Sequence, residues 1–301
     1  MASRLKRQRR KRFATQAAAF LLGNANLPGF ITGTIYQGSL KQICLPGLNC
    51  YSCPGALGAC PLGGLQNGLA DPLWRIPLYV LGFLMLIGIL LGRFVCGWLC
   101  PFGWFQELLH RIGWPSRRNK WRPTADLPLH RLLLHGKTVM LAVLVVSVPL
   151  MMRWLTGYGI PAFCTYFCPS GTLMAGIPLL LANSQLRELT GWVFSWKMSV
   201  LLAVILLSLW INRPFCRYLC PLGAIYGWMN RFSFYRITVD ENLCTRCGIC
   251  TRHCPMSAPI PFDGNDSSCI RCGECVQVCP QNAIVCGFSR QAVQPVKKKA
   301  E

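Results

Sequence analysis

Long apolar segments alternate with polar, mostly basic segments over the first two thirds of this 301-residue chain. Residues 76–95 and 192–211 each supply about 20 predominantly apolar positions, the length that a helix needs to cross the hydrocarbon core of a membrane. Residues 137–155 are nearly as apolar, and Pro149 is tolerable there because neighbouring helices can satisfy the freed carbonyl. The pattern predicts a membrane-spanning helix in each of these three segments.

A fourth apolar segment, residues 13–36, is interrupted by Asn24, Asn26 and Pro28. We predict that it also crosses the membrane, with a kink at these residues, as an anchor that is not removed. A cleaved secretion signal is the alternative, but the apolar part is long and has no convincing cleavage site. Residues 173–181 are too short to cross and predict an interfacial or re-entrant helix.

Basic residues favour one orientation for these four spans, because Lys and Arg mark the cytoplasmic segments of membrane proteins. They are concentrated before the first span and between the second and third, as Arg4, Lys6, Arg7, Arg9, Arg10, Lys11, Arg12, Arg111, Arg117, Arg118, Lys120, Arg122 and Arg131. The segments after the first and third spans carry few cations, mainly Lys41, Arg75 and Arg187. We therefore predict a multi-pass protein of the bacterial inner (cytoplasmic) membrane, in contact with lipid, with both termini in the cytoplasm.

Composition supports a membrane protein over a soluble enzyme with a single core. Hydrophobic residues make up 52% of the chain and charged residues 14%. The formal net charge of +21 could indicate nucleic-acid binding, but the cations lie in blocks beside apolar segments, as topology signals do. We expect no nucleic-acid partner.

Two copies of the pattern CxxCxxCxxxCP lie near the C-terminus of a chain that contains 19 cysteines. Three closely spaced thiolates of each copy hold one [4Fe-4S] cluster, while the fourth cysteine ligates the other cluster. The predicted ligand sets are Cys244, Cys247, Cys250 and Cys279 for the first cluster, and Cys269, Cys272, Cys275 and Cys254 for the second. Zinc sites are the alternative, although zinc does not need the third CxxC step or the following proline. Cys286 has no place in the motif.

This module resembles the bacterial two-cluster ferredoxins over residues 243–283. The fold class that follows is a membrane all-α domain of four transmembrane helices with a C-terminal α+β two-[4Fe-4S] ferredoxin module. The predicted boundaries are a basic N-terminus at 1–12, a membrane domain at 13–232 with an outer cysteine-rich loop at 41–75, the ferredoxin module at 235–288, and a polar tail at 289–301.

Two CxxxCP pairs follow apolar segments: Cys96 with Cys100, and Cys216 with Cys220. Helix periodicity would place the two thiols of each pair on one helix face. Both pairs follow an even-numbered span, so all four cysteines should lie at the cytoplasmic face, where one [4Fe-4S] cluster can form between them. The alternative is four inert thiols that pack helix ends. The likeness of "CGWLCPFG" and "CRYLCPLG" suggests a duplicated half.

A third pair, Cys164 and Cys168, follows the third predicted span and so should lie outside. The same side would hold four cysteines of the outer loop, Cys44, Cys50, Cys53 and Cys60. Four of these six sulfurs can hold an outer cluster with two left over. Disulfides are an equal alternative, because they persist on the oxidising side of a membrane.

With these spans, CxxxCP motifs and two-cluster module, the chain resembles the NapH and NosR type of membrane polyferredoxin over essentially its whole length. The resemblance implies electron transfer between the membrane quinone pool and other redox subunits of a respiratory complex. The cysteines that match the family's motifs are Cys96, Cys100, Cys216, Cys220 and the eight of the ferredoxin module. The six outer cysteines depart from that pattern, which leaves the partner and substrate open.

Two further cofactors are not expected on this chain. No flavin-binding domain is present, and the few histidines near the predicted membrane, His110, His130 and His135, are bunched on one side, so a transmembrane haem pair is disfavoured.

A quinone is a possible ligand, because Glu107 and His110 lie one turn apart after Cys100 and could accept the protons of a quinol. A solvated interfacial pair is the alternative for these two residues.

These features predict an electron-transfer subunit of a quinol-linked oxidoreductase complex. A different class of function is the second hypothesis: a membrane assembly or regulatory factor whose clusters serve the maturation of another metalloenzyme. A transporter is disfavoured because the spans contain few charges that would form a substrate path.

Overall fold

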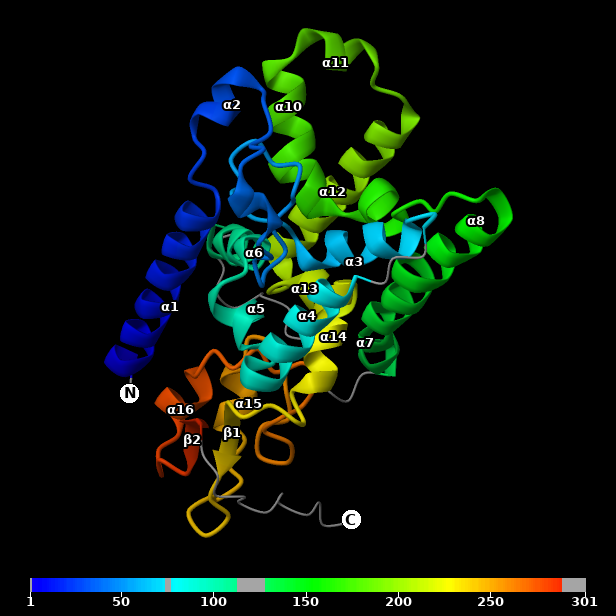
Figure 1. Ribbon diagram of the computed structural model, residues 1–301. Helices are drawn as coiled ribbons and strands as arrows, with labels where there is room; N and C mark the ends of the chain where they lie inside the picture. The colour runs from blue at the N-terminus through cyan, green and yellow to red at the C-terminus, as the bar shows by residue number, and fades with distance from the viewer. Residues whose placement is uncertain (1, 74–76, 113–127, 289–301) are drawn as a thin grey trace.

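The computed structural model describes residues 2–73, 77–112 and 128–288, which are mostly helical (Figure 1). The first half contains α1 (Ala2–Gly23), α2 (Pro28–Thr32), the 3-10 turn η1 (Ser39–Gln42), α3 (Pro61–Ala70), α4 (Leu78–Leu91), α5 (Phe94–Trp98) and α6 (Pro101–Ile112). The middle contains α7 (Pro128–Met140), the π-helical η2 (Leu141–Ser147), α8 (Val148–Thr156), η3 (Phe163–Phe167), α9 (Pro169–Gly171), η4 (Thr172–Gly176), α10 (Ile177–Ala182) and α11 (Ser184–Glu188). Then follow α12 (Trp192–Trp210), α13 (Pro214–Tyr218), α14 (Pro221–Met229), β1 (Arg236–Val239), α15 (Ile249–His253), α16 (Glu274–Val278) and β2 (Ile284–Gly287).

Two helices in the described part of the chain are long and apolar enough to cross a membrane. One runs continuously from Leu132 to Thr156 through α7, η2 and α8, and the other is α12. The helices predicted at 137–155 and 192–211 are therefore present. The wide π turn of η2 comes just before Pro149, where a proline ring would otherwise clash with the carbonyl four residues earlier.

The other two predicted spans are shorter than the sequence suggested. α4 has 14 residues and is about 21 Å long, against a hydrocarbon core of about 30 Å. It stops at Gly92, whose φ of 52° ends the helix before α5 begins. The prediction of four full spans is thus not supported: the apolar segment 76–95 bends into a second, short helix instead of continuing.

The basic N-terminal segment belongs to a helix that docks on the rest of the protein. α1 begins within the basic segment that was predicted to be a separate N-terminus, and it ends at Gly23. The helix is broken at Asn24 and Asn26, where the kink was predicted. Arg9 pairs with Glu274 of α16 at 2.7 Å, and Arg12 pairs with Glu274 at 3.2 Å and with Glu107 of α6 at 2.6 Å. α1 therefore links the C-terminal module to the apolar domain. Arg75, Arg117, Arg118, Lys120, Arg122 and the tail 289–301 lie outside the described residues.

The C-terminal module lies at the opposite end of the molecule from α10 and α11 (Figure 1). Strands β1 and β2 pair antiparallel, with Arg236 opposite Gly287 and Val239 opposite Ile284. α15 and α16 pack against each other beside these strands. This is the α+β arrangement that the repeated cysteine pattern predicted.

Apolar side chains are exposed along α4, η2, α8 and α12. The exposed set includes Leu78, Leu81, Met85, Leu86, Leu90, Val143, Val146, Met151, Trp154, Leu155, Leu202, Leu206 and Leu207. On α12, Trp192 and Trp196 are exposed at one end and Trp210 at the other. Tryptophans at both ends of an apolar helix are typical of helices that cross between two membrane interfaces.

The cysteine-rich segment predicted as an outer loop is folded into the interior. Cys44, Leu48, Cys53 and Cys60 are all at most 6% exposed. A parallel bridge joins Cys44 to Ala59 and closes the segment on itself. The segment therefore packs as part of the core between α1, α3 and the CxxxCP motifs.

Candidate metal centres

All 19 cysteines carry free thiols, and most of them are buried. Among the described residues, no three His, Cys, Asp or Glu side chains converge closely enough to hold a single ion. A tetrahedral zinc would draw its sulfurs to about 3.8 Å from one another, given a Zn–S bond of about 2.3 Å, whereas the ligands of a four-iron cubane surround a larger core. A cubane site therefore consists of four cysteines that are mutual neighbours around such a core.

The first such group contains Cys254, Cys269, Cys272 and Cys275. Burial, as the main cause, and negative charge on neighbouring cysteines of the group together raise the pKa of the first three of these thiols to about 12. Burial and the charges of the other three cysteines also raise the pKa of Cys275. Backbone N–H groups are directed at the sulfurs: Ala258 N lies 3.4 Å from Cys254 Sγ, and Arg271 N lies 3.4 Å from Cys269 Sγ. This environment fits an anionic cluster.

The second group contains Cys244, Cys247, Cys250 and Cys279, which line one small cavity of the C-terminal module. Cys247 is exposed, so this group lies at the surface. The two groups are built alike, because Arg246 and Arg271 both have a φ near +50° at the same position of their CxxC loops. Such left-handed turns direct successive amides into the loop, as anion-binding nests do.

The third group joins the CxxxCP motifs of two distant segments: Cys96, Cys100, Cys216 and Cys220. Burial, as the main cause, and the charges of Cys100 and Cys96 together raise the pKa of Cys216 to about 12. Burial also raises the pKa of Cys220, with added effects from the other three cysteines. All four sulfurs are therefore close neighbours, as the sequence predicted.

The local geometry of these motifs differs from the predicted one. α5 ends at Trp98 and α13 at Tyr218, so the two thiols of each pair do not share one continuous helix. The second cysteine instead precedes a new helix, with Pro101 or Pro221 as its first residue. Cys220 Sγ accepts the N–H of Gly223 at 3.4 Å. Proline favours a helix start, and a helix N-terminus stabilises negative charge, so each CP pair places a thiolate where the helix dipole favours it.

Two arginines that sequence reasoning missed hold the third group together. Arg93 Nη2 donates to the carbonyl of Cys216 at 2.9 Å, and Arg213 donates to the carbonyl of Cys96. Each arginine lies three residues before the first cysteine of its own motif, and both are fully buried. The signal was present in the sequence as RxxCxxxCP in both copies. These cations would offset the negative charge of four thiolates and of a cluster held between them.

Gln106 completes this site. Its side-chain amide lies 3.1 Å from Cys216 Sγ as a donor, and its carbonyl accepts the N–H of Phe215 at 3.1 Å. At the equivalent place of the second copy is Tyr226, fully buried, whose hydroxyl donates to the carbonyl of Pro46 at 3.2 Å.

Span counting predicted that Cys164 and Cys168 lie on the opposite membrane face from the third group, whereas the structure places their segments close together. The rings of Phe163 and Phe215, each directly before the first cysteine of its motif, have centroids 6.5 Å apart. A Cβ added at Gly47, in the predicted outer loop, would lie 3.0 Å from Cys100 Cα. Counting gives only the order of the crossings, whereas Gln66 contacts both Leu144, in the middle of the helix Leu132–Thr156, and Cys164, so Cys164 lies beside the middle of that helix. Of the six predicted outer cysteines, Cys50, Cys60, Cys164 and Cys168 are mutual neighbours, whereas the Cys53 thiol donates to Asn24 Oδ1.

The predicted quinone contacts have protein partners. Glu107 is 3% exposed and accepts from Arg12 at 2.6 Å and from Arg213 at 3.1 Å. Burial alone would raise the pKa of Glu107, but the charges of Arg213 and Arg12 together lower it, so the carboxylate does not readily take up a proton. His110 Nδ1 lies 3.1 Å from the carbonyl of Ser208. The two side chains therefore do not converge on one open site.

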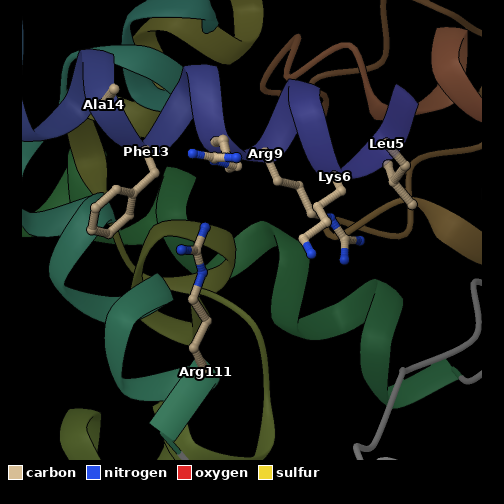
Figure 2. Close-up of a pocket in the computed structure, with 7 residues that line it drawn as sticks. Leu5, Lys6, Arg9, Phe13, Ala14 and Arg111 are labelled. Carbon is tan, nitrogen blue, oxygen red and sulfur yellow. The ribbon is translucent and has the colours of Figure 1, made fainter. Parts of the chain in front are cut away.

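A separate groove of about 520 Å³ lies between α1 and the end of α6, as Figure 2 shows. Its lining residues are Leu5, Lys6, Arg9, Arg10, Phe13, Ala14 and Arg111. The Arg111 guanidinium lies 4.9 Å from the centroid of the Phe13 ring, a cation–π contact. The groove is strongly cationic, and neither Glu107 nor His110 lines it.

A family model described as a 4Fe-4S binding domain matches the chain three times, at residues 73–122, 138–183 and 192–236. A model described as a 4Fe-4S dicluster domain matches residues 236–280. Each match to the first model contains one CxxxCP pair, so the predicted duplication is a triplication.

Three curated proteins illustrate the similarity. An uncharacterized protein of Methanocaldococcus jannaschii is 31% identical over 178 residues, which cover 59% of this chain and 64% of the relative. The methylamine utilization ferredoxin-type protein MauN of Paracoccus denitrificans is 30% identical over 58% of this chain and 50% of its own length. The regulatory protein NosR of Stutzerimonas stutzeri is 30% identical over 65% of this chain and 24% of its own length. The chain thus covers less than two thirds of each relative, and no solved structure matches it.

Proposed function

Because this chain belongs to the NapH/NosR-type family of 4Fe-4S ferredoxin proteins, we propose that it is a membrane-bound carrier that passes single electrons between the quinone pool and partner redox proteins. It would serve as an electron-transfer subunit of a quinol-linked complex. The helix Leu132–Thr156, helix α12 and the tryptophans at both ends of α12 support a place in the cytoplasmic membrane, in contact with lipid.

One observation carries this proposal: the third group of cysteines lies directly against the ligand loop of the ferredoxin module. Gly97, next to Cys96, packs on the carbonyl of Ile270, next to Cys269. Trp98 Nε1 donates to the carbonyl of Arg271 at 3.2 Å, and Arg93 donates to the carbonyl of Ser267 at 2.7 Å. A cluster in the third group would therefore sit next to the buried cluster of the module.

We assign three clusters to these residues. Cys244, Cys247, Cys250 and Cys279 would hold the exposed one, Cys254, Cys269, Cys272 and Cys275 the buried one, and Cys96, Cys100, Cys216 and Cys220 the one between module and membrane. Each cluster supplies reversible one-electron chemistry. The chain supplies buried thiols, N–H donors to sulfur, and the arginines that offset the negative charge.

The third cluster is tested by Cys216→Ala in protein loaded with iron under anaerobic conditions. The electron paramagnetic resonance (EPR) signal of one cubane should disappear, and iron should fall by about four atoms per chain, while the two ferredoxin signals remain. Cys286→Ala is the matched control, because Cys286 belongs to none of the groups. An unchanged spectrum in Cys216→Ala would refute the assignment.

The quinone step needs a separate experiment. A water-soluble quinol analogue is added to the oxidised, iron-loaded protein in lipid vesicles, and cluster reduction is followed by EPR. We expect reduction of at least one cluster in the wild type. If no cluster changes its oxidation state, also when a redox partner is supplied, electron exchange with quinone is excluded.

A second candidate function is a membrane factor that regulates or assembles another metalloenzyme. The observation that favours it is the relative described as the regulatory protein NosR. The two functions differ in turnover: a respiratory subunit cycles electrons continuously between quinol and acceptor, whereas a regulatory factor exchanges them once per event. Steady-state quinol oxidation with a purified partner complex separates the two.

A further inference from the structure

Four cysteines outside the three clusters surround one point in the interior. Cys50 Sγ and Cys168 Sγ lie 3.7 and 3.8 Å from the position that a Cβ at Gly171 would take. Cys60 precedes Pro61, the first residue of α3, and Gln66 of the same helix accepts the N–H of Cys164 at 3.2 Å. Two distant segments, 50–60 and 164–168, thereby bring two cysteines each to the same place.

Electrostatics agrees with this geometry. Burial, as the main cause, and charges on Cys50 and Cys60 together raise the pKa of Cys168 to about 12. The pKa of Cys164 is raised by charge on Cys168, Cys60 and Cys50, and the pKa of Cys60 is raised by charge on Cys50. Every pair among the four cysteines is therefore close enough to interact electrostatically. The same complete set of pairs is found among Cys96, Cys100, Cys216 and Cys220.

The local construction also repeats that of the third group. Gly171 N lies 3.4 Å from Cys168 Sγ, just as Gly223 N lies 3.4 Å from Cys220 Sγ. Lys197 Nζ donates to the carbonyl of Cys164 at 3.2 Å, in the role that the two buried arginines have toward Cys96 and Cys216. N-terminal helix ends and a cation are thus provided at both places.

The two remaining cysteines of this region have other roles. Cys53 is fully buried, and its thiol lies 3.6 Å from Asn24 Oδ1 as a hydrogen-bond donor, in a small apolar cluster with Ala56 and Met174. The Cys44 backbone pairs with Ala59, and its pKa is raised by burial without a contribution from the four. Cys53 lies beside Cys50, but its thiol is engaged with Asn24, and the other four cysteines form the complete set of neighbours.

The segment from Pro46 to Cys50 connects this place to the third group. Pro46 accepts from Tyr226, Gly47 packs on Cys100, and the carbonyl of Leu48 accepts from Ser170 Oγ at 3.1 Å. Consecutive Cα atoms are 3.8 Å apart, so Gly47 and Cys50 are separated by about 11 Å at most. That is far less than the hydrocarbon thickness of about 30 Å.

We propose that Cys50, Cys60, Cys164 and Cys168 hold a fourth [4Fe-4S] cluster, which lies beside the third cluster and not across the membrane from it. This inference rests on the proposed function, since it takes the CxxxCP pairs to be cluster ligands. The four clusters would then form one line, from the exposed cluster of the module to the fourth, with single electrons passing between neighbours. Two disulfides among the same four cysteines are the competing outcome.

The test is iron content and Mössbauer spectroscopy of the full-length protein loaded with iron-57. The wild type should bind about sixteen iron atoms per chain, and Cys164→Ala should bind about twelve, with all four-iron signals of the other clusters kept. Cys53→Ala is the matched control and should keep about sixteen. About twelve atoms in the wild type, or equal losses in Cys164→Ala and Cys53→Ala, would overturn the fourth cluster.

Two measurements keep the outcomes apart. The wild-type iron content decides the question even if Cys164→Ala does not fold. Cys216→Ala distinguishes failure of the fourth cluster from failure of the proposed function: loss of one four-iron signal in that variant, together with about twelve atoms in the wild type, would leave the third cluster standing without the fourth. If two disulfides replace the cluster, mass spectrometry after alkylation without a reductant would then show that these four cysteines are not alkylated.

Discussion

Glu107 joins α1, α6 and the segment before α13 through one buried carboxylate, paired with Arg12 and Arg213. Removal of one partner from a buried ion pair leaves an uncompensated charge and costs about 3–5 kcal/mol. We expect Glu107→Gln to lower the free energy of unfolding by about that amount, measured by chemical denaturation in detergent micelles.

The pH dependence of this loss separates a structural from a proton-accepting Glu107. Because the pKa of the folded state is lowered, the carboxylate contributes its full stability above its ordinary pKa, and this contribution disappears only as the pH falls through the lowered value. The difference between wild type and Glu107→Gln should thus be the same at pH 6 and pH 8. A difference that shrinks toward pH 6 would show a carboxylate that titrates near neutrality, as a quinol-coupled base would.

Gln106 should tune the third cluster through its hydrogen bond to Cys216 Sγ. Hydrogen bonds to ligand sulfur favour the more negative, reduced state of a cluster, so Gln106→Leu should lower the midpoint potential. A loss of about 1 kcal/mol in this preference corresponds to a shift on the order of tens of millivolts, measurable by an EPR-monitored redox titration. Tyr226→Phe is the matched control in the other copy, because its hydroxyl donates to Pro46 and not to a sulfur. Equal shifts in both variants would contradict this role.

The docking of α1 depends on two arginines with different surroundings. Both pair with Glu274, but the Arg12 side chain is 4% exposed and that of Arg9 is 46% exposed. Half-exposed pairs contribute about 0–1 kcal/mol, whereas a broken buried pair costs about 3–5 kcal/mol. Hydrogen exchange of the α1 amides should therefore increase strongly in Arg12→Ala and little in Arg9→Ala. Little increase in either variant would mean that α1 is held by its apolar contacts, and a strong increase in both would contradict the difference expected from burial.

At the level of helices, the sequence predicted well wherever one local rule decides the outcome. The apolar segments 137–155 and 192–211 form helices, and the repeated CxxCxxCxxxCP pattern matches a dicluster domain. Prediction failed for the apolar segment 76–95, because its length fits one long helix as well as the two shorter helices α4 and α5 that it forms. Gly92 and the CP pairs interrupt the helices around Cys96 and Cys216, and a hydropathy window averages over such breaks.

For the site as a whole, the cysteines were identifiable from their spacing, but their neighbours depend on long-range packing. The four cysteines of the third group could be grouped in advance because their two motifs are alike, and the structure brings these cysteines together. The closeness of Cys164 and Cys168 to the third group could not be predicted, because a count of crossings gives a side and not a depth, and Gln66 holds Cys164 beside the middle of the helix Leu132–Thr156. Arg93, Arg213 and Gln106 escaped notice because each acts on the opposite copy of the motif, more than 100 residues away in the sequence.

Charge distribution over the molecule suggests which partner approaches the exposed cluster. The chain carries a formal net charge of +21, and α1, whose exposed side chains include Arg4, Lys6, Arg7, Arg10 and Lys11, packs beside α16 of the ferredoxin module. Such a field accelerates the approach of an acidic protein, and salt screens it. Reduction of the exposed cluster by an acidic one-electron carrier should slow by about tenfold or more as salt rises from low to high ionic strength.

A cationic viologen is the control donor for this experiment, because the same field repels it and salt should leave its rate unchanged or raise it. The double variant Arg7→Glu/Arg10→Glu should flatten the salt dependence with the acidic carrier while iron content stays the same. Stopped-flow absorbance of the clusters gives both rates. If the acidic carrier and the viologen respond to salt alike, the cationic face of α1 does not guide the partner, and the docking surface must lie on a neutral part of the module.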